Sequence, residues 1–299
     1  MLTIGYSSCD FLDIVPDEIT TEADAFKDRN AAKNFVYSCY GYLPQSNVAS
    51  GSLDLLTGDE VITAFEHETF ASFPKGNYTA SSPVISYWNT FFQGLRQCYI
   101  FLENVDKVPD LTESVKTDYI AQVKFLIAYY HYQLARCYGP IILIKELPDV
   151  NASQAEYLPR TSYDECVDWI CNLLDEAASS LPAIRTNKED YGLATSVGAK
   201  AVKAKMLLYA ASPLFNGNSS FYSNFTDKSG SQLMPLTYDP NKWVKAKTAI
   251  KEAIDLAEQN GHALYVKQDY KIGNEDANPY PAAGPVRCLR TSLGRLGFA

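Results

Sequence analysis

Apolar residues recur every three or four positions along most of the chain, which is the spacing of one face of an α-helix. Between residues 112 and 138 the recurring apolar positions are Ile120, Val123, Ile127, Tyr130, Leu134 and Cys137. The Gly139-Pro140 pair that follows is typical of a helix end. The same spacing predicts further helices over residues 31–42, 83–107, 163–180, 195–211 and 240–260, with Pro83 in the first turn of its helix. The pattern therefore predicts a mainly α protein.

Two of these segments, 195–211 and 240–260, carry alanine at most of the recurring positions. Small side chains let two helices approach closely, as they do in helix-hairpin repeats. The pattern of Trp, Ala and Ile that starts at Trp243 is similar to that of tetratricopeptide helices, although no strict repeat period is present. We therefore expect tetratricopeptide-like helical hairpins. The short apolar run from Ile141 to Ile144 is expected to be extended.

Two long polar segments rich in aromatic residues, 43–82 and 216–239, separate the helices. Loops of this length are uncommon in compact domains unless they bind something or are disordered. Rings beside amide and carboxylate side chains suit a sugar, because the ring covers the apolar face of the pyranose and the polar groups meet its hydroxyls. The alternative is that most of these rings anchor the loops onto the helical core, and Trp88 is expected to do so.

The composition narrows the function further. The chain has 299 residues, 46% of them hydrophobic, and a formal net charge of −9. An acidic chain without a basic stripe is a poor candidate for nucleic-acid binding, because phosphates require clustered Lys and Arg. The sequence has no uninterrupted apolar run long enough for a transmembrane helix.

The cysteines and histidines do not indicate a metal or cofactor site. The seven cysteines are irregularly spaced and form no C-x-x-C pair, so Cys39, Cys98, Cys137, Cys166 and Cys171 are expected to be small apolar core residues. His131 lies among tyrosines within a helical segment and is expected to be a hydrogen-bonded core residue. We therefore expect no metal and no cofactor.

Catalytic motifs are absent from the sequence as well. Neither the phosphate-loop string nor the G-x-S-x-G elbow of the α/β-hydrolases occurs. A glycosidase would need two carboxylates facing each other across a sugar, and only the acids of the first long loop are placed to offer them. Catalysis is therefore not expected.

Six strings, in one order, resemble the SusD/RagB family of nutrient-capturing outer-membrane lipoproteins of Bacteroidetes. They are SCDFLDIVP (8–16), YWNTFFQGLRQCYIFLENVDKV (87–108), KFLIAYYHYQLARCYGPIILI (124–144), LPRTSYDECVDWICNLLDEAASSLP (158–182), ATSVGAKAVKAKMLLYAASPLFNG (194–217) and WVKAKTAIKEAIDLA (243–257). The resemblance implies an α/α superhelix of tetratricopeptide-like hairpins that supports long irregular ligand-binding loops.

The resemblance also implies a function without catalysis or cofactors. Family members capture glycans at the cell surface and deliver them to a SusC-type TonB-dependent transporter in the outer membrane. Ser7 and Ser8 precede Cys9 as in a bacterial lipoprotein signal, and the resemblance makes Cys9 the expected lipidation site. A lipid anchor at Cys9 would place the chain on the outer membrane, exposed at the surface.

The expected organisation follows from where the resemblance begins and ends. Residues 1–9 are interpreted as a residual lipoprotein signal, residues 10–276 as a SusD-like helical domain, and residues 277–299 as an atypical tail. Family members are about twice as long, so the chain is interpreted as the N-terminal part of the family fold, with a signal too short to direct export.

The candidate ligand contacts are loop aromatics and acids that flank the variable face of the family: Asp59, Glu60, Phe73, Tyr78 and Tyr222. Two other functions remain open. One is a tetratricopeptide-type scaffold that binds a protein partner, because two helices are lined with alanine. The other is a helical glycosidase.

Three positions depart from the family pattern. Tyr99 stands in place of a common Asn, Gln122 in place of a common Glu, and Ile127 in place of a common Arg. We expect these changes to remove polar partners that brace the helices against one another.

Overall fold

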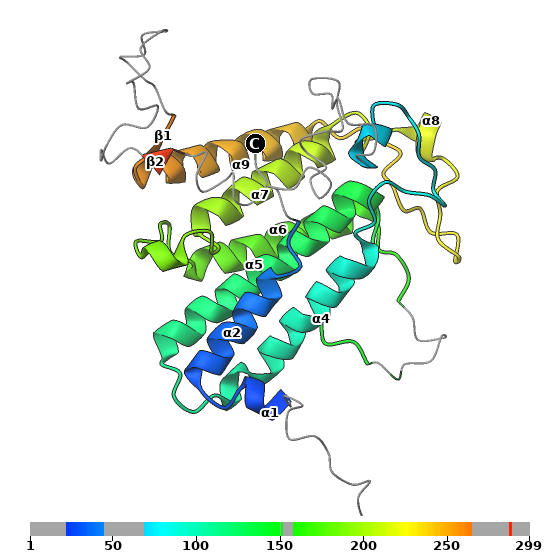
Figure 1. Ribbon diagram of the computed structural model, residues 1–299. Coiled ribbons are helices and arrows are strands. Elements are labelled where there is room, and N and C mark those ends of the chain that lie inside the picture. The colour runs from blue at the N-terminus through cyan, green and yellow to red at the C-terminus, as the bar shows by residue number, and fades with distance from the viewer. Residues whose placement is uncertain (1–21, 45–68, 150, 152–157, 265–286, 289–299) are drawn as a thin grey trace, which may run out of the picture.

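The computed structural model describes residues 22–44, 69–149, 151, 158–264 and 287–288 (Figure 1). Within these ranges the elements are α1 (Glu22–Ala25), α2 (Arg29–Tyr40), the 3₁₀ turn η2 (Thr69–Ser72), α4 (Trp88–Asn104), the 3₁₀ turn η3 (Val105–Lys107), α5 (Glu113–Tyr138), α6 (Tyr163–Ser180), the 3₁₀ turn η5 (Lys188–Asp190), α7 (Ser196–Ala211), α8 (Ser219–Tyr222), α9 (Asn241–Gln259), and the short parallel strands β1 (His262–Ala263) and β2 (Arg287–Cys288).

The long helices stack in chain order and alternate in direction (Figure 1). α4 packs on α5, α5 on α6, α6 on α7, and α7 on α9, while α2 lies against both α4 and α5. Each helix therefore forms a hairpin with the next one along the chain. The succession of hairpins confirms the predicted tetratricopeptide-like superhelix.

Most helix boundaries agree with the sequence pattern to within two residues, but the predicted start at Pro83 is wrong. α4 begins at Trp88, after Tyr87 as its N-cap residue. The backbone N–H of Tyr87 donates to the hydroxyl of Tyr138 at 3.0 Å. Just before Pro83, Thr79 and Ser82 form an isolated antiparallel bridge. Because Val84 and Ile85 are β-branched, the segment that follows Pro83 is a poor start for a helix.

α5 is the centre of the fold and is buried on nearly every side between Ala121 and Ala135. The sequence pattern indicated one buried stripe, but α2, α4, α6 and α7 together enclose this helix. Its buried polar side chains have partners, as buried polar groups generally do. The Nδ1–H of His131 donates to the carbonyl of Ile127 at 2.8 Å, and its Nε2 accepts from the backbone N–H of Ile144 at 3.1 Å. The prediction of a hydrogen-bonded core histidine is confirmed.

The segment that contains Ile141 and Ile144 runs between α5 and α6 without forming a strand. Its backbone groups bond to side chains and to one neighbouring segment instead of to a sheet. The carbonyl of Ile141 accepts from the backbone N–H of Thr161 at 2.7 Å, and the carbonyl of Ile144 accepts from the hydroxyl of Tyr99 at 2.6 Å. Tyr99 therefore ties α4 to this segment.

Ion pairs join successive helices on their outer side. Asp175 on α6 meets Lys200 and Lys203 of α7 at 2.6 and 2.5 Å. Burial would raise the pKa of Asp175, but the hydrogen bonds from both lysines outweigh it and hold this pKa below its usual range. Lys242 of α9 meets Asp164 of α6 at 2.5 Å. These pairs fix the register of three consecutive helices.

The cysteines behave as the sequence indicates. Cys39, Cys98, Cys166 and Cys171 are buried free thiols, and Cys137 is partly exposed. Burial raises the pKa of Cys166 to about 11, which keeps this thiol protonated at neutral pH. The four buried cysteines thus act as small apolar core residues, as predicted.

Candidate functional site

The first aromatic loop ends in a compact turn that presents two rings together. Phe73 and Tyr78 lie with their ring centroids 5.5 Å apart and their planes tilted by 59°. The backbone N–H of Gly76 donates to the carbonyl of Phe73, and Gly76 has a φ of 65°, a region that favours glycine. Tyr78 is 52% exposed. The turn therefore offers a ring face to solvent.

Trp88 joins this loop to the helical core. Its ring meets the edge of Tyr138 at a centroid distance of 5.2 Å and an interplanar angle of 89°. The guanidinium of Arg160 lies 5.5 Å from the Trp88 ring, and its Nη1 donates to the carbonyl of Pro140 at 3.0 Å. The expectation that Trp88 belongs to the core side of the loop is confirmed.

The second aromatic segment, between α7 and α9, divides into anchoring and exposed rings. Phe215 stacks on Tyr163 of α6 with centroids 4.9 Å apart and planes 11° from parallel, so this ring fastens the segment to the core. Phe221 is 73% exposed and meets Tyr222 in a T-shaped contact at 5.1 Å. Tyr222 is half-buried, and burial raises its pKa. Both interpretations of the loop aromatics therefore apply, each to different rings.

The ends of the second segment are held together by Asn216 and Asp239. The side-chain amide of Asn216 donates to the carbonyl of Asp239, and its oxygen accepts from the backbone N–H of Asp239, both at 2.9 Å. Asn216 is buried. The backbone N–H of Tyr163 also donates to the carbonyl of Leu233 at 2.9 Å. A loop of more than twenty residues is thus closed at its base and fixed at its middle.

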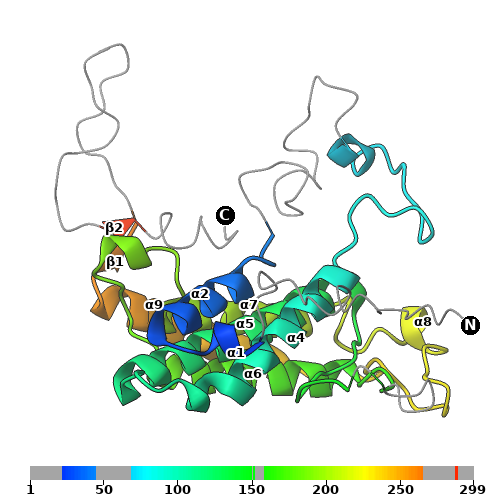
Figure 2. The same ribbon diagram turned by 60° about the horizontal axis from the view of Figure 1, so that its bottom comes forward.

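The structure brings only some of the predicted contacts together. Phe73 and Tyr78 form one pair, whereas Tyr222 lies on α8, and Figure 2 shows the segment around η2 well away from α8. Asp59, Glu60 and the predicted lipidation residue Cys9 lie outside the described residues. Phe221 and Tyr238, which the sequence analysis did not select, expose more of their surface than Tyr78 does. Their signal was a position among turn residues.

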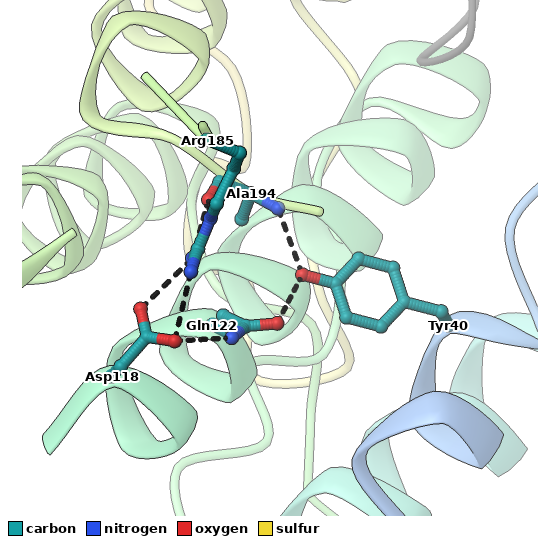
Figure 3. A network of polar contacts seen from close by, with 5 residues as sticks. All are labelled: Tyr40, Asp118, Gln122, Arg185 and Ala194. Carbon is teal, nitrogen blue, oxygen red and sulfur yellow. Dashed lines mark hydrogen bonds and ion pairs between the residues drawn. The ribbon is translucent and has the colours of Figure 1, made fainter. Parts of the chain in front are cut away.

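A separate polar network lies at the other end of the α5 helix (Figure 3). Arg185 forms a bidentate ion pair with Asp118, at 2.9 and 2.8 Å, and donates to the carbonyl of Ala194 at 2.8 Å. Gln122 donates to Asp118 at 2.8 Å and accepts from the hydroxyl of Tyr40 at 3.0 Å. That hydroxyl in turn accepts from the backbone N–H of Ala194 at 2.9 Å.

This network corrects the expectation about the departures from the family pattern. Gln122 is buried and connects α5 to Tyr40 of α2, and Tyr99 binds the segment after α5. Ile127 is buried among apolar side chains. The helices are therefore braced by different polar partners and are not left without them.

Within the described residues, no group of three or more His, Cys, Asp or Glu side chains is arranged to hold a metal ion. In the same part of the chain, no helix combines the length and the apolar character that a membrane span requires.

Replacing Gly217 by alanine tests the closed base of the second loop. Gly217 has a φ of 78°, and a Cβ there would lie 2.3 Å from the backbone nitrogen of Tyr238. We expect Gly217→Ala to lower the free energy of unfolding by about 2 kcal/mol, because left-handed strain and overpacking add. Gly230→Ala is the matched control, since its φ is 88° but no atom lies within 4 Å of its Cβ. Equal losses in urea unfolding would contradict the close approach at Gly217.

A superhelix of paired helices that supports two aromatic loops defines a tetratricopeptide-like helical binding protein. Residues 10–208 match the sequence model of the SusD-like family that is described as starch-binding and associating with the outer membrane. The chain therefore belongs to the SusD-like family.

Individual relatives agree with this assignment. The solved protein BT4246 is 37% identical, with a TM-score of 0.72 over 80% of this chain and 42% of its own. SusD-like protein P25 of Formosa agariphila is 22% identical over 67% of this chain and 40% of its own length. A laminarin-binding SusD-like protein of known structure is 21% identical, with a TM-score of 0.52 over 62% of this chain and 41% of its own. The chain thus spans about two fifths of the length of these relatives.

Proposed function

We propose that the chain is a non-catalytic glycan-binding protein that captures an oligosaccharide or polysaccharide at its aromatic loops. The exposed pair of Phe73 and Tyr78 is the observation that carries this proposal. A sugar binds where an aromatic face meets its apolar side and polar groups meet its hydroxyls, and Asn77 lies within the same turn. The starch-binding description of the family supports this reading.

The proposal extends to the surroundings of the protein. A SusD-like chain that associates with the outer membrane would be exposed at the cell surface, anchored by lipid at Cys9, and would deliver glycan to a SusC-type TonB-dependent transporter. The description of the family as associating with the outer membrane supports the location. Export of a variant with Cys9→Ala into the soluble fraction, against membrane retention of the parent, would test the anchor.

The test of the ligand face is a binding measurement with Tyr78→Ala. We expect the affinity for the best ligand from a panel of plant and host polysaccharides to fall by about tenfold, because one ring contact contributes about 1 kcal/mol and burial of its area adds to that. Tyr191→Ala removes another exposed tyrosine, on the turn between α6 and α7, and serves as the matched control. Isothermal titration calorimetry on the full chain provides the affinities.

Two outcomes would contradict the proposal. One is equal binding by Tyr78→Ala and the parent, which would place the ligand elsewhere. The other is the absence of binding to every polysaccharide by a chain whose helical circular dichroism spectrum is intact.

A protein-binding scaffold is the second candidate, favoured by apolar side chains on the outer side of the last long helix. Val244 and Ile254 of α9 are 61% and 51% exposed. Exposed apolar groups in a row are typical of a surface that meets another protein. Retention of a protein partner by the parent but not by a Val244→Asp, Ile254→Asp variant would support this function over glycan capture.

A further inference from the structure

A cavity of about 810 Å³ lies between α2, the first turns of α5 and the segment that joins α6 to α7. Its size falls within the range of small-molecule sites, roughly 300–1,000 Å³. Tyr119, in this cavity, and Tyr138, against Trp88, lie 19 residues apart on α5. At ~1.5 Å per residue, about 28 Å of helix separate the cavity from the first aromatic loop. The cavity is therefore distinct from the ligand face proposed above.

One wall of the cavity carries two cations. Arg29 and Lys33 are four residues apart on α2 and both line the cavity. Among the described residues, no carboxylate lies within ion-pair distance of the side chain of either one. A hydrogen bond with the Tyr37 hydroxyl raises the pKa of Lys33, and its ammonium lies 5.5 Å from the centroid of the Tyr37 ring. In a chain with a net charge of −9, an unneutralised pair of cations is unusual.

The acids of the cavity leave this positive charge largely uncompensated. Asp118 is occupied by Arg185 in the bidentate pair, and Glu113 is paired with Lys116 at 2.7 Å. Asp190 is the remaining carboxylate in the lining. The balance is one positive charge in excess, which favours a ligand with a single acidic group.

The other lining groups suit a sugar ring. Two tyrosines, Tyr37 and Tyr119, lie on adjacent helices, and the hydroxyls of Ser114 and Thr117 and the amide of Asn187 are exposed around them. Ring faces beside hydroxyl and amide groups are the chemistry that recognises a saccharide. An extended peptide would need a free sheet edge or an apolar groove, and the walls here are helices with polar rims.

The floor of the cavity gives it a fixed shape. Asp118, Gln122 and Arg185 belong to the network of Figure 3, in which each is bonded to another member. The network joins α2, α5 and the segment before α7. Because these three elements are tied together beneath the cavity, a ligand would meet walls that are already in place, which lowers the conformational cost of binding.

We propose that this cavity is a second ligand site, which takes a short oligosaccharide that bears a carboxylate. Arg29 and Lys33 hold the carboxylate, and Tyr37 and Tyr119 pack against the sugar ring. The site requires no contribution from the aromatic loops, so it stands or falls independently of the ligand face at Tyr78.

Trigalacturonic acid and its methyl ester are the probes that test this proposal, because they differ only in the carboxylate charge. We expect the full chain to bind the acid at least tenfold more tightly than the ester, with an affinity that weakens as salt rises. The double variant Arg29→Gln, Lys33→Gln should lose at least tenfold in affinity for the acid, since a hydrogen bond to a charged group contributes more than a neutral one. Titration calorimetry measures all three affinities.

Lys27→Gln is the matched control, because it removes an exposed charge next to α2 that does not line the cavity. We expect this variant to bind the acid as the parent does. Equal binding of acid and ester, equal loss in the control and double variants, or no binding of the acid by the folded parent would each overturn the proposal. Tyr78→Ala should leave trigalacturonic acid binding unchanged, and a loss there would assign the probe to the loop face instead.

Discussion

Replacing Arg185 by alanine is expected to lower the free energy of unfolding by about 3 kcal/mol, because it leaves a partly buried carboxylate without its partner. The side chains of Arg185 and Asp118 are only 11% and 25% exposed. The variant also removes the donors to the carbonyl of Ala194 that secure the segment before α7. Urea unfolding followed by circular dichroism should show a lower midpoint with an unchanged m-value.

Two comparisons separate burial of the pair from loss of charge alone. Lys251→Ala breaks a surface pair with Asp255 whose side chains are 74% and 42% exposed, and it should cost less than about 1 kcal/mol. Asp118→Asn keeps an acceptor for Arg185 and Gln122 and should have an effect between these two. A loss in Arg185→Ala as small as that in Lys251→Ala would show that the network contributes little to stability.

The stability of the chain should fall by about 3 kcal/mol between about pH 6.5 and pH 4.5 through His131 alone. Burial lowers the pKa of His131 to about 4, more than its hydrogen bond to Ile127 raises it. Between that value and the unfolded pKa of 6.5, the unfolded histidine binds a proton that the folded one does not, so acid favours unfolding. The tautomer agrees, because the unprotonated Nε2 accepts from the Ile144 N–H.

The variant His131→Gln isolates this contribution from that of the carboxylates. It keeps a donor and an acceptor but does not titrate, so its free energy of unfolding should depend less steeply on pH by the amount given above. The imidazole resonance of His131 provides a check on the parent itself. A histidine that titrates near pH 6.5 at this position would contradict the neutral buried state.

The helices could be predicted from the sequence because their signal is local. A repeat of three and four apolar positions, with Gly139 at one end, marks α5 without any knowledge of its neighbours. The extent of its burial could not be predicted, because four other helices decide which faces meet solvent. The start of α4 was missed for a related reason: the backbone of Tyr87 bonds to Tyr138, a residue far along the chain.

The candidate sites were predicted less completely. Phe73 and Tyr78 pair through a local turn, so composition pointed to them. The cavity depends on Arg29, on Asp190 and on the segment between α6 and α7, which come together only in three dimensions. Gln122 shows the same limit: comparison with a family pattern suggested a lost brace, whereas Tyr40, eighty-two positions away in sequence, provides one. Polar partners are set by the assembled fold.

The reciprocal hydrogen bonds of Asn216 and Asp239 make the second loop an exchangeable module. Because its two ends are joined to each other, the residues between them can change in type and number while α7 and α9 keep their packing, since loop-closure entropy grows only slowly with length. A single helical frame could in this way acquire new ligand preferences by altering Phe221 and its neighbours alone. In such an architecture, recognition can evolve quickly while the scaffold changes slowly.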